Sequence, residues 1–186
     1  MAVHVVNEGA SPVHASLEIQ AWREPAALVA QGRMPVEVPA RGGLTLSCVE
    51  VLGQFIDLNH AYRFGPPPCD ALSARLCAVD GQSLADAFTF PAGLGPLLAR
   101  PRPEIGLAAQ VLQAEGDVAR VAVATRDLAV DLQVEVAGWT VEDGHFHLPP
   151  GGRRELALRR HRPGARLAGR VCATNAIQDV LLELKP

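Results

Sequence analysis

Aromatic residues are scarce in this sequence, at 4% of the 186 residues. A protein that binds sugars through a β-sheet usually offers exposed rings, because the C–H face of a sugar packs against an aromatic face. Only Trp22, Tyr62 and Trp139 are plausible carbohydrate contacts. Trp22 ends an alternating segment and Trp139 follows Gly138, so packing in or near the core is favoured over display to a ligand.

The sequence also lacks an excess of charge of one sign and a long hydrophobic run. The net charge is −3 and the hydrophobic fraction is 48%. A polyanionic partner such as nucleic acid is therefore not expected. No segment approaches the roughly 18 apolar residues of a membrane span. The cations are 16 arginines and one lysine, Lys185, which with the abundant Ala and Gly suggests a GC-rich bacterial genome.

Cysteine pairs at metal-binding or redox spacing are absent. The four cysteines show no CxxC motif and no histidines at zinc-ligand spacing, and we interpret them as buried free thiols. A Cys69–Cys77 bridge is the alternative for an oxidising compartment. His145 and His147 share a strand face, but the sequence offers no third ligand nearby. We predict no metal and no other cofactor. The four positions are Cys48, Cys69, Cys77 and Cys172.

Short catalytic motifs are missing as well. There is no nucleophile elbow and no glycine-rich phosphate loop. Glu142 and Asp143 are adjacent carboxylates before Gly144, but neighbouring residues of a strand point to opposite faces, so a solvated turn is favoured over an acid/base pair. No catalytic residue is predicted, and an enzymatic role for this chain by itself is not supported.

What the sequence does contain is a turn that occurs once in each half. A strand ends on proline and reverses through paired glycines, first at Val36 to Leu46 and again at Phe146 to Leu158. Proline stops a strand because it lacks the ladder N–H, and glycine allows a left-handed or tight backbone. The two copies are about one immunoglobulin-type sandwich of ~100 residues apart. We therefore predict an all-β chain with two tandem immunoglobulin-like β-sandwich domains.

Most other segments have the two-residue alternation of half-buried strands. Val13 to Trp22 is the clearest, and Asp80-Gly81 predicts a hairpin between two apolar runs. Ile105 to Ala114 also fits an amphipathic helix, although a strand is favoured. The predicted strands are Val3 to Val6, Val13 to Trp22, Leu28 to Ala30, Val36 to Val38, Leu44 to Leu52, Ala71 to Val79, Leu84 to Phe90, Ile105 to Gln113, Val118 to Thr125, Leu128 to Val136, Phe146 to Leu148, Leu156 to Leu158 and Val171 to Leu184.

Proline and glycine mark the domain boundary. The stretch Pro91 to Pro103 holds four of the 15 prolines and two glycines. We predict a sandwich over residues 1–95, a proline-rich linker over 96–103 and a second sandwich over 104–186.

Arginines concentrate in the second half. Seven of the 16 lie between Arg153 and Arg170, a segment whose single acid is Glu155. A solvated face is the favoured interpretation. The alternative is a contact with another domain or subunit through Arg153, Arg154, Arg159 and Arg160.

The residues also resemble a known family. VHVVNEGASPVHASLEIQAW, VEVPARGGLTLSCVEV and LADAFTFPAG resemble the immunoglobulin-like module that follows the catalytic barrel in bacterial β-mannosidases. AVDLQVEVAGWTVEDGHFHLPPGGRRELAL and RLAGRVCATNA resemble the last sandwich domain of the same enzymes. The resemblance runs from about Val3 to Leu184, with the segments in the same order.

This resemblance implies a non-catalytic C-terminal accessory region. The catalytic carboxylates of such glycosidases lie on a (β/α)8 barrel of roughly 250 residues, which has no counterpart in this sequence. The implied partners are the barrel of the parent enzyme and a second copy in a homodimer. An oligosaccharide is a partner that an independent binding module would have. An independent carbohydrate- or protein-binding module is the alternative. No signal peptide precedes the first strand, so we expect a cytoplasmic or periplasmic bacterial protein, or a piece of a longer chain.

Overall fold

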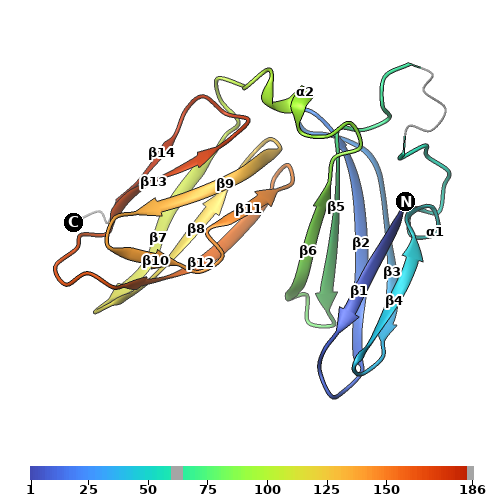
Figure 1. Cartoon of the computed structure of the whole chain (residues 1–186), viewed down its shortest axis with the longest axis horizontal. Helices are drawn as coiled ribbons and strands as arrows, with labels where there is room; N and C mark the ends of the chain where they lie inside the picture. The colour runs from blue at the N-terminus through green and yellow to red at the C-terminus, as the bar shows by residue number, and fades with distance from the viewer. Residues whose placement is uncertain (60–64, 184–186) are drawn as a thin grey trace. The chain divides into compact units, whose positions relative to one another are not determined.

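The computed structural model describes residues 1–59 and 65–183, and its fold is all-β, as predicted (Figure 1). The chain divides into two compact units, Met1–Leu94 (unit 1) and Gly95–Pro186 (unit 2). Each unit is built from antiparallel sheets that enclose a hydrophobic core of its own.

Unit 1 combines a four-stranded sheet, in the order β3-β2-β5-β6, with the strand pair β1-β4. Leu17 and Ile19 of β2 are almost fully buried and pack with Val38 of β3 and Leu72 of β5. The elements are β1 (Ala2–Asn7), β2 (Val13–Arg23), β3 (Ala27–Val38), β4 (Gly42–Ser47), α1 (Cys48–Leu52), β5 (Ala71–Ala78) and β6 (Ser83–Thr89).

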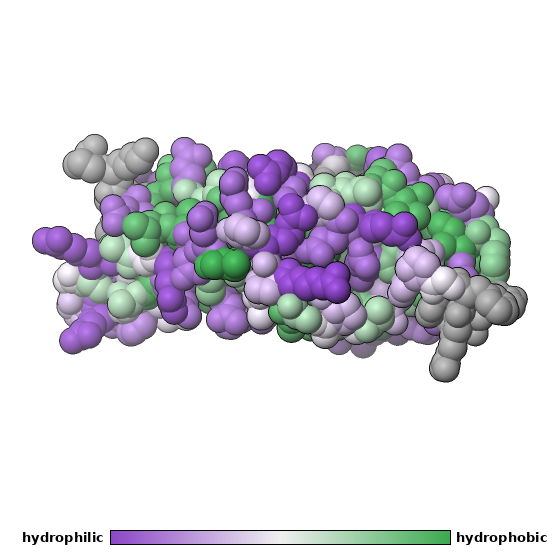
Figure 2. Space-filling model, turned by 90° about the horizontal axis from the view of Figure 1, so that it is seen from above, coloured by the Kyte–Doolittle hydropathy of each residue, from purple (hydrophilic) through white to green (hydrophobic). Residues whose placement is uncertain are grey.

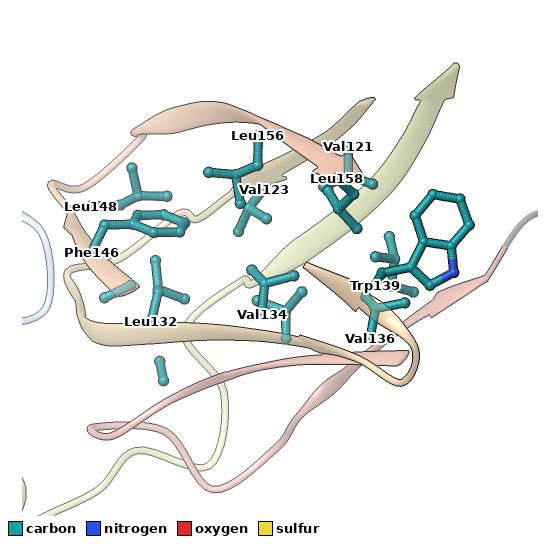
Figure 3. Packing of buried hydrophobic residues seen from close by; sticks show 14 of the residues in the cluster. Val121, Val123, Leu132, Val134, Val136, Trp139, Phe146, Leu148, Leu156 and Leu158 are labelled. Carbon is teal, nitrogen blue, oxygen red and sulfur yellow. The ribbon is translucent and has the colours of Figure 1, made fainter. Parts of the chain in front are cut away.

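Unit 2 contains two four-stranded sheets, β10-β12-β8-β7 and β11-β9-β13-β14. Figure 3 shows the apolar side chains that fill the space between them, with Val121 and Val123 of β8 near Leu156 and Leu158 of β12. The elements are α2 (Gly95–Leu98), β7 (Ala108–Glu115), β8 (Val118–Ala124), β9 (Ala129–Val136), β10 (Trp139–Val141), β11 (His145–Leu148), β12 (Arg153–Arg160), β13 (Ala168–Ala173) and β14 (Val180–Glu183).

The two units share a strand topology. The pairs β1–β4, β2–β3, β2–β5 and β5–β6 of unit 1 recur in unit 2 as β8–β12, β9–β11, β9–β13 and β13–β14. Unit 2 adds two strands that have no counterpart in unit 1. Strand β7 pairs with β8, and β10 pairs with β12. The sheet of unit 1 that contains β1 and β4 therefore has two strands, whereas the equivalent sheet of unit 2 has four.

The Pro/Gly turn has the same place in both units, and it links different sheets. It leads from β3 to β4 in unit 1 and from β11 to β12 in unit 2, and neither pair shares a sheet. The left-handed residue is Gly151 in the second turn (φ 70°), as expected for glycine, but it is Arg41 in the first (φ 48°). Arg41 N–H donates to the Gly9 carbonyl (3.0 Å) and Gly151 N–H to the Arg126 carbonyl (3.1 Å). Both turns are thus anchored to a neighbouring connection.

Local strand predictions mostly agree with the structure. Val13 to Trp22 lies in β2 with its apolar face inward. The hairpin at Asp80-Gly81 joins β5 to β6, with Gly81 at φ 88°. Ile105 to Gln113 contributes to strand β7, so the helical alternative is wrong. Pro35 lies within β3, an edge strand, where a missing N–H is tolerated.

Some predicted strands have different bounds or structure. The strand predicted over Leu44 to Leu52 is wrong beyond Ser47, because residues 48–52 form the helix α1. This helix ends at Gly53 in the left-handed conformation (φ 66°), a common helix stop. It packs over β3 at Gly32, where an added Cβ would lie 2.0 Å from the Val51 carbonyl oxygen.

Unit 2 departs from the predictions at three further elements. The segment predicted as one strand over Val171 to Leu184 is divided between β13 and β14 by an intervening turn. Strand β10 was not predicted, since three residues are too few for a periodic signal. The proline-rich segment includes the short helix α2.

Candidate functional site

The adjacent carboxylates Glu142 and Asp143 lie in the turn between β10 and β11. Asp143 has a left-handed backbone (φ 51°), its side chain is 82% exposed, and its carboxylate lies 3.7 Å from the Arg154 guanidinium. A retaining acid/base pair needs two carboxyl groups about 5–5.5 Å apart in a cleft. An exposed turn does not provide this environment, in agreement with the solvated-turn interpretation.

The histidines of β11 take part in strand contacts. His147 Nδ1 accepts a hydrogen bond from the Asp131 N–H (2.9 Å), while His145 is exposed. Within the described residues, no group of three or more His, Cys, Asp or Glu side chains is arranged to hold a metal ion.

The four cysteines are free thiols, and the alternative Cys69–Cys77 bridge does not form. Cys48 and Cys69 are buried in the core of unit 1. Burial, followed by the nearby Asp70 carboxylate, raises the pKa of the Cys69 thiol to about 11. The thiolate is the nucleophilic form, so Cys69 is a packing residue at neutral pH.

Both tryptophans are internal, and Tyr62 lies outside the described residues. Trp22 is 7% exposed, and its indole N–H donates to the Ser73 hydroxyl (3.1 Å). Trp139 is also 7% exposed and donates to the Arg166 carbonyl (3.2 Å). Both indole rings are therefore packed inside their units. This agrees with the core-packing interpretation that the sequence favoured over a sugar contact.

Arg160 is held by several contacts within unit 2. Its guanidinium lies over the Trp139 ring (5.3 Å), and Nε donates to the Asp117 carboxylate (2.7 Å). A further hydrogen bond reaches the Gly116 carbonyl. Arg160 therefore ties the end of β12 to the β7–β8 turn and covers Trp139.

The other arginines of the cluster differ in their contacts. Arg154 lies over the Phe146 ring (5.0 Å), Arg153 pairs with Glu155 (3.2 Å), and Arg159 is exposed on β12. Figure 2 shows hydrophilic side chains interrupted by separate hydrophobic areas on the face in view. Acids from outside the segment pair with three of its seven arginines, namely Arg154, Arg160 and Arg170.

A buried polar group that the sequence did not single out supports unit 2. Asn175 is fully buried, and its side chain accepts from the Val130 N–H (2.8 Å) and donates to the Leu128 carbonyl (2.9 Å). It holds the start of β9 against the β13–β14 connection. Nearby, the buried Asp127 carboxylate pairs with Arg126 (3.1 Å) and Arg102 (3.4 Å). The amide of Asn175 and the carboxylate of Asp127 are thus both engaged in contacts within unit 2.

None of the helices in the described residues is long and apolar enough to cross a membrane.

Comparison with known proteins yields structural likeness without sequence matches. No protein-family model and no curated protein matches the chain. An exo-chitosanase of Amycolatopsis orientalis is similar in structure, with a TM-score of 0.67 and 12% identity over 98% of this chain and 25% of that chain. A β-D-mannosidase of Dictyoglomus thermophilum has a TM-score of 0.65 and 13% identity over 88% of this chain and 18% of that chain.

The chain therefore spans about a quarter of the exo-chitosanase and less of the mannosidase. At these identities the likeness concerns the fold. The architecture of this chain, two β-sandwich units in succession, is one that occurs as a part of larger glycoside hydrolases.

Proposed function

We propose that this chain is a non-catalytic accessory region of a β-mannosidase-like glycoside hydrolase. The supporting observation is the extent of the structural match, which covers 98% of this chain but 25% of the exo-chitosanase. The catalytic machinery of the proposed parent enzyme lies on a separate barrel and acts on terminal β-mannosides or related glycosides.

The role proposed for the two units is structural. They pack on the barrel and shape the rim of its active site. The side chains of the candidate sites are consistent with this role, because the indoles, the buried thiols and Arg160 make contacts within their own units. An interdomain or subunit contact through Arg153, Arg154, Arg159 and Arg160, homodimer formation and oligosaccharide binding remain predictions.

An activity and binding assay on the purified chain tests this proposal. We expect no hydrolysis of p-nitrophenyl β-D-mannoside or p-nitrophenyl β-D-glucosaminide above the buffer control. We also expect a flat calorimetric trace with mannan-derived oligosaccharides at millimolar concentration. Turnover that persists after a second purification step would contradict the non-catalytic role, and saturable sugar binding would favour the independent carbohydrate-binding module.

A further inference from the structure

Strand β1 has an unpaired edge among the described strands of unit 1. It pairs on one side with β4, from Ala2 opposite Ser47 to Asn7 opposite Gly42. The Met1 carbonyl accepts the Cys48 N–H (3.2 Å), so the odd-numbered residues direct their peptide groups toward the β4 side. Peptide groups alternate along an antiparallel strand. The N–H and C=O groups of Ala2, His4 and Val6 therefore face the free edge.

In unit 2 the equivalent edge is covered. Strand β8 corresponds to β1, and its even-numbered residues face β7, which pairs from Ala108 opposite Ala124 onward. Strand β7 also contacts β14 and so closes this flank between the two sheets (Figure 1). Unit 2 thus shows that an added strand, β7, covers the edge that corresponds to the open edge of β1.

The core of unit 1 is less well covered at the open flank. When the β1–β4 register is aligned with the β8–β12 register, Val3 corresponds to Val121 and Val5 to Val123. Val121 and Val123 are fully buried, whereas Val3 and Val5 are only half-buried. A groove runs between β1 and β6, lined by apolar side chains that include Val5, Leu17, Leu76 and Leu84. An added strand would shield this surface from water.

The edge of β1 also lacks the usual protection against strand addition. Natural edge strands carry charges, proline or bulges that discourage pairing. The edge strand β3 has Arg33, Pro35 and Glu37, and β7 has a register shift between Val111 and Gln113. Strand β1, with the sequence AVHVVN, has no Lys, Arg, Asp, Glu or Pro and pairs with β4 without interruption.

The chemistry of the groove indicates the kind of strand that fits. Among the described residues that line it, Asp86 is the one carboxylate and there is no Lys or Arg. In unit 2, the residues of β7 that pair with Ala119 to Ala124 are uncharged, and Ala109 and Val111 face the core. A matching strand is uncharged and has small apolar side chains at alternate positions.

We propose that the β1 edge and the β1–β6 groove bind an extended strand of a partner polypeptide by β-addition. The partner strand runs antiparallel to β1 and bonds to the peptide groups of Ala2, His4 and Val6. A single strand can bridge both sheets as β7 does. This proposal does not depend on the glycoside hydrolase assignment.

The probe is a peptide that has the uncharged part of β7 and one flanking residue, Leu107–Ala114. We expect its addition to the full chain to slow hydrogen exchange at the Ala2, His4 and Val6 amides. Val6 is 72% exposed, so Val6→Pro removes one free-edge N–H while leaving the β4 ladder intact. This variant should weaken peptide binding at least tenfold, whereas the matched control Val6→Ala should stay within about twofold of the parent chain.

A second peptide makes the test independent of how the variants fold. Gln110 pairs with Ala122, whose peptide group faces β7, so N-methylation at Gln110 should abolish binding. Equal binding of the methylated and unmethylated peptides would overturn the proposal, as would the absence of any exchange protection at millimolar peptide. Concentration-dependent dimers that Val6→Pro abolishes would assign the edge to a second copy, and so contradict the partner strand.

Discussion

At the scale of single residues, the structure separates side chains that the sequence groups together. Arg159 and Arg160 are neighbours in one arginine-rich segment, yet only Arg160 has both an aromatic ring and a carboxylate as partners. Its partners Asp117 and Trp139 come from other elements, so its role depends on tertiary contacts that the local sequence does not contain.

We expect Arg160→Ala to lower the free energy of unfolding of unit 2 by about 1–2 kcal/mol. The loss combines a cation–π contact with a partly exposed ion pair, each worth up to about 1 kcal/mol. Arg159→Ala is the matched control and should change stability by less than about 0.5 kcal/mol. Urea denaturation monitored by tryptophan fluorescence measures both, and equal effects would contradict the role assigned to Arg160.

A further consequence concerns docking experiments. Because Arg160 stabilises its own unit, a loss of activity or assembly in an Arg160 variant would not by itself indicate an interdomain contact. Arg159 is the better probe of the predicted interdomain surface, since its side chain is exposed on β12.

At the scale of elements, the Pro/Gly turn connects two sheets in each unit. The sequence correctly predicted a chain reversal at both positions, because Pro39, Pro149 and the paired glycines carry that signal. Sequence alone did not indicate that the flanking strands belong to different sheets, since strand pairing is decided by distant residues. It also did not indicate that Arg41 takes the left-handed position which Gly151 takes in the second copy.

Gly151→Ala should destabilise unit 2 by about 1 kcal/mol, because the left-handed backbone brings Cβ close to the following carbonyl oxygen. Apart from atoms of its own residue and its two chain neighbours, an added Cβ there meets no atom within 4 Å, so the cost comes from backbone conformation alone. Arg41→Ala is the matched control, since that position already carries a Cβ, and it should stay within about 0.5 kcal/mol of the parent chain. A Gly151→Ala variant with unchanged thermal stability would contradict this account.

At the scale of the whole molecule, the fold class followed from the sequence because strand alternation and turn residues are local signals. Val13 to Trp22 and Asp80-Gly81 are examples. The candidate sites were harder to predict, because burial decides their roles. Trp22 and Trp139 are candidate sugar platforms in the sequence but are packed inside the units. The β1 edge was not identified, because whether a strand has a neighbour is a property of the sheet.

Each unit has a separate core, so we propose that each is an independently folding domain. Residues 1–94 and 95–186, expressed separately, should each give a cooperative thermal transition. Chains of this length commonly fold alone when they have a core of their own. Circular dichroism and differential scanning calorimetry provide the measurement. If either half lacked a cooperative transition, the two-domain interpretation would be wrong.

The claim that this chain is an accessory region is tested most directly by the reading frame upstream of codon 1 in the genome. Our account predicts an open frame that continues upstream and encodes a (β/α)8 barrel with two carboxylates at the ends of its strands. An in-frame stop codon immediately before Met1, with no glycosidase barrel encoded in the same frame, would contradict it.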